Sequence, residues 1–350
     1  MRFFERLFKR ASKAPSENAA PRIAALQLAW RTDTTMPVVD WNAAHEQAKE
    51  HPETSALRDY WWSAAIGWLD ALRDHLGDRY RIEMSNSFAV LSSLEDKPLQ
   101  LVVASCERYR KHILRSLEGI ASSWGHGPHV VLIFDDIDAY YDYVGNYYPD
   151  GGTYSMSSGM FIQHGYGHFV FRSSSVSDME PTIAHELTHC LLAPLRIPAW
   201  LNEGTAVNME HHLTPHYEDP RHKSAKLREA ALDRAAFWNA QTIQEFWSGK
   251  SFKRPDKGSG LSYDLAKELT RLIARDFGRY RAFMNVAHRK DGGVEAAAST
   301  LEFTLGDLAG AVLGDGPWEP DPAAWQEGTE RGQFRGSIQG RDRTFAVDRN

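Results

Sequence analysis

The sequence predicts an α+β fold, in which a small mixed sheet comes first and a mainly helical part follows. Short, apolar, strand-like segments occur in the first half of the chain, and His129–Phe134 (HVVLIF) is the clearest of them. From Asp178 onward, apolar residues recur every three or four positions, which is typical of amphipathic helices. Strands followed by a run of helices are the order expected of an α+β architecture.

The elements of the first half are assigned from their periodicity. A helix is expected from Val38 to Leu76 and another from Pro98 to Ser122, because apolar residues follow one another at i+3 and i+4 in both. The aromatic stretch Tyr140–Met156 is expected as a locally packed loop, with the lining of a cleft as the alternative. The remaining segments are expected as strands, with a hairpin through Gly165-Tyr166-Gly167: Tyr80–Met84, Phe88–Ser92, His129–Phe134, Met160–His164 and His168–Arg172.

The second half is expected to be helical to its end. The predicted helices are Asp178–Leu195, Pro198–His212, His222–Asp233, Thr242–Ser248, Ser262–Asp276, Arg279–His288, Val294–Leu301, Leu305–Leu313 and Asp321–Glu327.

Charge and cysteine content narrow the classes of function. A net charge of −6 offers no basic face for nucleic acid. The chain contains no run of about 18 apolar residues, so no stable membrane insertion is expected, and charges interrupt the apolar residues near the N-terminus, unlike in a secretory signal. Because the two cysteines, Cys106 and Cys190, make no disulfide scaffold, a cytoplasmic protein is expected.

The segment IAHELTHCLL, residues 183–192, carries the strongest chemical signal. On a helix, His185 and His189 project from one face, because they lie four positions apart, and both imidazoles can share a metal ion. Glu186 is placed beside the first histidine, where it can take a proton from a metal-bound water molecule.

A third ligand follows in IPAWLNEGTAVNMEHH, residues 197–212, which supplies Glu203. A catalytic zinc ion typically takes three protein ligands and keeps one position for water, and two histidines with one glutamate are such a set. Pro198 suits the start of a second helix, and two helices joined by a short turn can bring Glu203 back over the histidines. The sequence therefore predicts a site for one Zn²⁺ ion.

These two elements together resemble a known group of enzymes. HELTH followed by WLNEG is similar to the gluzincin metallopeptidases, in which H-E-x-x-H lies on one helix and a glutamate of the next helix completes the zinc site. The WLNEG element is similar to that of the M1 aminopeptidases, and the whole also resembles the smaller, peptidase-MA-like bacterial proteins. The resemblance covers residues 159–277 and implies that His185, His189 and Glu203 are zinc ligands and that Glu186 is the general base.

The same resemblance implies roles for two further residues. Glu210 matches a further acidic position and is expected to orient a ligand or a nearby tyrosine. Tyr263, at the start of a later helix, occupies a place comparable to the tyrosine that stabilises the tetrahedral intermediate. The alternative, that Tyr263 only packs as part of an ordinary helix, stays open. The G-x-M-E-N element that grips a substrate amino terminus is missing from the chain, so aminopeptidase activity is not expected.

The expected function is a zinc-dependent metallopeptidase that acts on a peptide or protein, which the edge strand of the hairpin can bind by strand addition. Two alternatives stay open: a zinc-binding scaffold or regulator with little or no hydrolysis, and an interaction module in which the motif is incidental.

On this interpretation the chain divides into four regions. Residues 1–22 form a disordered or amphipathic N-terminal segment, and residues 23–127 form an α+β region. Residues 128–327 form a zincin-like metallopeptidase domain with a helical C-terminal half, in which the sheet and its edge hairpin pack on the HELTH helix. Residues 328–350 form a disordered tail.

Overall fold

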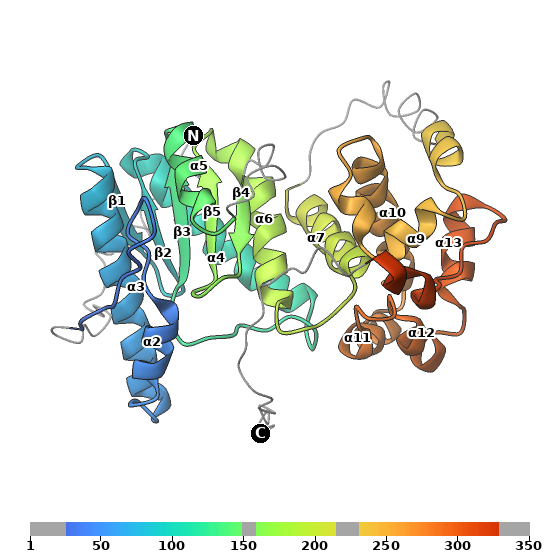
Figure 1. Ribbon diagram of the computed structural model, residues 1–350, viewed down its shortest axis with the longest axis horizontal. Coiled ribbons are helices and arrows are strands. Elements are labelled where there is room, and N and C mark those ends of the chain that lie inside the picture. Colours follow the sequence, from blue (N-terminus) through green and yellow to red (C-terminus); the bar gives the residue numbers. More distant parts are fainter. Residues whose placement is uncertain (1–25, 149–158, 215–230, 329–350) are drawn as a thin grey trace, which may run out of the picture.

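The computed structural model describes residues 26–148, 159–214 and 231–328. They form a mixed α+β structure, with a five-stranded sheet in the first half and a helical part after it, as predicted (Figure 1). The predicted segment 1–22 lies outside the described residues, as does the predicted tail 328–350 apart from Gly328. Most of the predicted helix His222–Asp233 also lies outside them; its residues 231–233 are described and belong to a helix that continues to residue 237.

The first helical segment differs from the prediction. Two helices, α2 (Trp41–Ala48) and α3 (Thr54–Leu76), stand in place of the single helix expected from Val38 to Leu76. Pro52 lies between them, and a proline both lacks the backbone N–H and disfavours helical geometry in the residue before it. The helix therefore stops before the proline and starts again after it.

The five strands are where the sequence placed them, and the hairpin is confirmed. They are β1 (Arg81–Met84), β2 (Phe88–Ser92), β3 (His129–Phe134), β4 (Gly159–Ile162) and β5 (His168–Arg172). Their order is β1-β2-β3-β5-β4; the three central strands run parallel, and each edge strand is antiparallel to its neighbour. The expected boundary between residues 127 and 128 falls between two hydrogen-bonded strands of this sheet.

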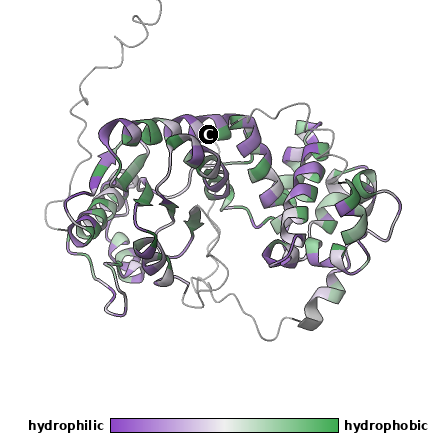
Figure 2. Ribbon diagram, turned by 90° about the horizontal axis from the view of Figure 1, so that it is seen from above, coloured by the Kyte–Doolittle hydropathy of each residue, from purple (hydrophilic) through white to green (hydrophobic). Residues whose placement is uncertain are grey.

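Helices cover both faces of the sheet, so each central strand is buried on both sides (Figure 2, where the strands are mostly green). Alternate residues of β3 point to opposite faces: Val131 and Ile133 to α4 (Asp96–Ser116) and α6 (Val176–Leu192), and Val130 and Leu132 to α2 and α3.

Two further predictions are corrected. The stretch expected as a loop from Tyr140 begins as a helix, α5 (Ile137–Gly145), since Tyr140 and Tyr143 are fully buried against the sheet. Its later residues, 149–158, lie outside the described part of the chain. Helix α4 ends at Ser116 and not at Ser122, because the chain turns at Gly119, whose φ of 77° a helix does not allow.

The C-terminal half is helical, as predicted. Its described elements are α7 (Ala199–Leu213), α9 (Thr242–Trp247), η1 (Lys250–Lys253), α10 (Gly258–Ile273), α11 (Phe277–Val286), α12 (Val294–Thr300), α13 (Leu305–Leu313) and η2 (Pro322–Gly328). Helices α6 and α7 lie in the middle of the molecule, between the sheet and the remaining helices (Figure 1). Among the described helices, none is long and apolar enough to cross a membrane.

Helices α7 and α10 touch backbone to backbone at Gly204. A Cβ atom at Gly204 would lie 2.2 Å from the hydroxyl oxygen of Thr270 and 2.3 Å from the carbonyl oxygen of Ala266. The carbonyl of Ala266 is a backbone group and cannot move aside as a flexible side chain could. Helix α7 can therefore approach α10 this closely only with glycine at position 204.

We expect the substitution Gly204→Ala to lower the free energy of unfolding by about 1–3 kcal/mol, because the added methyl group forces the two helices apart. Urea unfolding followed by circular dichroism measures this. The control is Gly145→Ala at the end of α5, where a Cβ would meet nothing within 4 Å and the change should stay within about 0.5 kcal/mol. Equal effects of the two substitutions would contradict the packing argument.

Candidate metal centre

Helix α6 holds the HELTH segment rigidly against the core. Its apolar side chains at Ile183, Leu187 and Leu191 are buried. The loop after α4 supplies donors for two carbonyl groups in the last turn of α6. The Ser122 N–H donates to the carbonyl of Leu191 at 3.1 Å, and the Trp124 indole N–H donates to that of Cys190 at 2.7 Å.

Helix α7 begins after Pro198 and folds back along α6. The turn between α6 and α7 is held by the segment that follows α11, since the backbone N–H of Arg289 donates to the carbonyl of Arg196 at 2.9 Å. The Thr205 hydroxyl lies 2.6 Å from that of Tyr280 in α11, which fixes the rotation of α7 about its axis. Glu203 is thereby turned towards the histidines of α6.

The side chains of His185, His189 and Glu203 converge on one point. The Nε2 atoms of the two histidines are 3.0 Å apart, and Glu203 Oε2 lies 3.4 Å from that of His185 and 3.2 Å from that of His189. Zinc–ligand bonds of about 2.0–2.2 Å at tetrahedral angles separate ligand atoms by about 3.3–3.6 Å. The triangle therefore has nearly the size of one face of a tetrahedral site, and these three residues can hold a metal ion.

The chemistry of these atoms also fits a cation. Glu203 Oε2 is buried and has no hydrogen-bond partner among the described residues, which is costly for a carboxylate oxygen. The nitrogen atoms that face it belong to imidazoles, whose neutral form binds zinc. A positive ion at the centre of the triangle would satisfy all three atoms at once.

Buried carboxylates dominate the electrostatics of the site. Burial alone would lower the pKa of His185, but its contacts with Glu203 and Glu210 outweigh burial and raise that pKa to about 10. Burial would likewise raise the pKa of Glu203, but the neighbouring His189 and His185 hold it well below its usual range. The site thus favours positive charge between the ligand atoms.

Glu210 contacts the other nitrogen of a ligand. Its Oε2 lies 3.1 Å from His185 Nδ1, so of the two expected roles, orienting a ligand and orienting a tyrosine, the geometry matches the first. The Nδ1 atom of His189 has no such partner among the described residues and is buried.

Glu186 lies between the metal triangle and the edge of the sheet. Its Oε2 accepts a hydrogen bond of 2.9 Å from the backbone N–H of Phe161 in β4. Burial raises the pKa of Glu186 although His189 and His185 act against it, so this carboxylate binds a proton more readily than an exposed one.

Tyr263 stands at the other side of His185. The centres of their rings are 6.5 Å apart, and the Tyr263 ring also packs edge-on against Phe252, with centres 5.2 Å apart. Burial and the charges of Glu203 and Glu186 raise the pKa of the phenol, which keeps its proton. Its hydroxyl makes no hydrogen bond to the described residues, so the donor is free, and its catalytic role stays a prediction.

Two groups that hold the site in place, the backbone N–H of Phe161 and the side chain of Trp124, cannot be predicted from a sequence pattern. The N–H of Phe161 is a backbone group, and every strand residue has one. Trp124 acts through the carbonyl of Cys190, which no spacing rule connects to it. Gly204, in contrast, stands directly after a ligand inside WLNEG, and a glycine inside a helix indicates a packing constraint.

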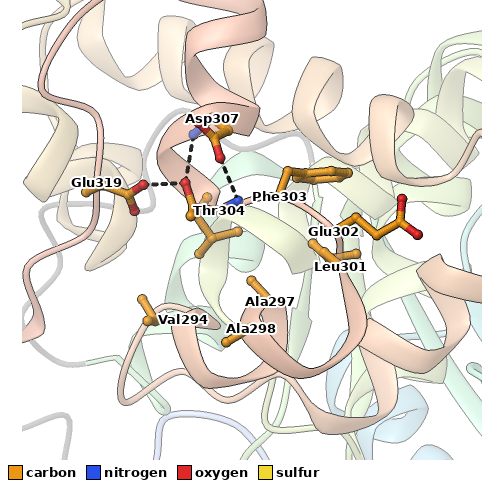
Figure 3. Close-up of a pocket in the computed structure, with 10 residues that line it drawn as sticks. Val294, Ala297, Ala298, Leu301, Glu302, Phe303, Thr304, Asp307 and Glu319 are labelled. Carbon is orange, nitrogen blue, oxygen red and sulfur yellow. Dashed lines mark hydrogen bonds between the residues drawn. The ribbon is translucent and has the colours of Figure 1, made fainter.

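A hollow of about 320 Å³ lies between α12 and α13, on the far side of the helical half from α6 (Figures 1 and 3). Its polar groups bond to one another: the Asp307 N–H donates to the Thr304 hydroxyl at 3.0 Å, the Asp307 carboxylate accepts from the Thr304 N–H at 3.0 Å, and Glu319 bonds to the same hydroxyl. These contacts cap α13. The reactive groups of the site are gathered at the metal triangle and not in this hollow.

No family model and no curated protein matches the chain. The geometry of the metal centre is therefore the basis for the function proposed below.

We expect the purified protein to carry one metal ion per chain, and we expect His185→Ala and Glu203→Ala each to abolish stoichiometric binding. Removing one of three ligands leaves the others short of the set that zinc needs. Elemental analysis after extensive dialysis measures the content. His212→Ala, an exposed histidine of α7, is the control and should keep the metal. Loss of metal in the control but not in the ligand variants would refute the assignment.

Proposed function

We propose that the protein is a zinc-dependent peptidase of the gluzincin type, in which His185, His189 and Glu203 bind one Zn²⁺ ion and Glu186 is the general base. The observation that carries the proposal is the position of Glu186. Its carboxylate lies beside a three-atom ligand triangle and is hydrogen-bonded to the edge strand along which an extended peptide can lie. A structural metal site needs no such base.

Two nitrogen ligands and one oxygen ligand suit zinc, with one coordination position left for water or substrate. A zinc ion held there would acidify a water molecule and polarise the carbonyl of the substrate. Glu186 then accepts the proton of the water as its oxygen bonds to the carbonyl carbon. When the C–N bond breaks, Glu186 passes that proton to the leaving amine. Tyr263 donates a hydrogen bond to the oxygen on which negative charge develops.

The position of β4 at the edge of the sheet supports a peptide as substrate. Among the described strands, β4 pairs only with β5. An extended peptide can pair with such an edge through main-chain hydrogen bonds. The bond to be cleaved would then pass beside Glu186, which already contacts this edge.

We expect Glu186→Gln to keep the zinc ion and to lower kcat by about 10²–10⁴-fold, because an amide cannot accept the proton of water. Cleavage of a broad peptide library, with metal content measured on the same samples, checks this. A zinc-loaded wild-type protein that cleaves nothing would contradict the peptidase and favour the alternative, a zinc-binding scaffold. A Glu186→Gln variant that remains active would refute Glu186 as the base.

We expect Tyr263→Phe to lower kcat by about 10²-fold or more and to leave KM nearly unchanged, since the hydroxyl acts on charge that appears only in the transition state. The phenyl ring keeps the packing on Phe252, so the melting temperature should not change. If kcat of the variant equals that of the wild type, Tyr263 is an ordinary packing residue.

A further inference from the structure

Two partly exposed aromatic rings stand side by side next to the metal centre. Trp124, in the loop before β3, is 41% exposed, which is unusual for so large an apolar side chain. Phe161 of β4 is partly buried and packs on Phe169, with ring centres 5.0 Å apart. Both rings therefore offer apolar surface to a molecule that binds at this place.

Each ring is tied to the metal helix through a different contact. The backbone N–H of Phe161 donates to Glu186 at 2.9 Å, and the indole N–H of Trp124 donates at 2.7 Å to the carbonyl of Cys190, the residue after His189. The aromatic surface thus runs along the HELTHC segment itself, from the proposed base to the end of α6. A ligand on this surface would be next to the reacting bond.

Gly167 lets the tips of both rings come close to the backbone between them. A Cβ atom at Gly167 would lie 2.9 Å from Cζ of Phe161 and 3.4 Å from Cη2 of Trp124. Its backbone does not have a positive φ, unlike that of Gly165 in the same turn, where φ is 65°. Conformation therefore explains glycine at 165, whereas at 167 the requirement is for space.

We propose that Trp124, Phe161 and Gly167 form a specificity subsite that takes one aromatic or large aliphatic side chain of the substrate, next to the scissile bond. The inference rests on the proposed peptidase function. The rings supply the two walls, and an incoming ring can stack on or meet them edge-on. The backbone of Gly167, which lies close to both ring tips, supplies the floor. The substrate class is accordingly a peptide with a large apolar residue at one position flanking the cleaved bond.

The test compares matched peptides that differ only by Phe or Ala at each position beside the cleaved bond, with the zinc-loaded full-length protein. We expect a preference of about tenfold or more in kcat/KM for Phe at one position. Gly167→Ala should reduce this preference to less than about threefold and leave kcat/KM for the Ala peptide nearly unchanged. Trp124→Ala should reduce the preference to the same extent, while the loss of its hydrogen bond to the carbonyl of Cys190 lowers kcat/KM for both peptides by a common factor. A merely structural role would lower kcat/KM for both peptides alike.

Matched controls are available for both variants. Trp30 is 40% exposed and lies far from α6 in the sequence, and Gly145 has nothing within 4 Å of its Cβ position; Trp30→Ala and Gly145→Ala should keep the preference. Melting temperature and zinc content are measured for all four variants. If Trp124→Ala unfolds, Trp124→Leu replaces it, because the shorter side chain still covers the core but loses the ring.

A binding measurement separates this proposal from the peptidase function. The affinity of zinc-loaded Glu186→Gln for the same peptides is measured by calorimetry. Preferential binding of the Phe peptide that Trp124→Ala abolishes, without any cleavage by the wild type, would uphold the subsite and overturn the peptidase. Cleavage with no side-chain preference, or with a preference that survives both substitutions, would overturn the subsite alone. Neither cleavage nor selective binding would overturn both.

Discussion

Glu203 has to reach two histidines on a different helix, and the close packing of α7 decides whether it does. The carboxylate comes from α7, the imidazoles come from α6, and the three ligand atoms lie within 3.4 Å of one another. On its other side α7 touches the backbone of α10 through Gly204. A cluster of this size tolerates little displacement. The packing of α7 against the helical half therefore holds Glu203 close to the two histidines.

The sheet holds α6 in place from the side opposite to α7. Its three central strands are buried on both faces, so they form a rigid platform under α4 and α6. The edge strand β4 is short, which limits unwanted pairing with other chains. One of its outward-facing N–H groups is bonded to Glu186. The same contact therefore engages a backbone group of the edge strand and orients the carboxylate that we propose as the base.

Most of the fold could be predicted because its signals are local. Periodicity predicts the five strands and most helices, and the spacing within HELTH and WLNEG predicts that the three ligand residues come together. Two failures have local causes, Pro52 between α2 and α3 and the positive φ of Gly119 after α4. The others have non-local causes. Burial of Tyr140 and Tyr143 under the sheet makes a helix of a segment whose composition indicates a loop. The hydrogen bonds of Phe161 and Trp124 to α6 join segments far apart in sequence, and no pattern along the chain encodes them.

The site also carries a cost that a bound cation would offset. Two imidazoles and a carboxylate are buried together, Glu203 Oε2 has no hydrogen-bond partner among the described residues, and a second carboxylate, that of Glu186, lies next to them. A cluster selected only for stability would be replaced by apolar side chains of similar volume. Any ion that binds the folded state and not the unfolded one stabilises the fold by its binding free energy. Since the ligands come from α6 and α7, that stabilisation acts at the junction of the sheet-bearing and helical halves and adds to the apolar core that already joins them.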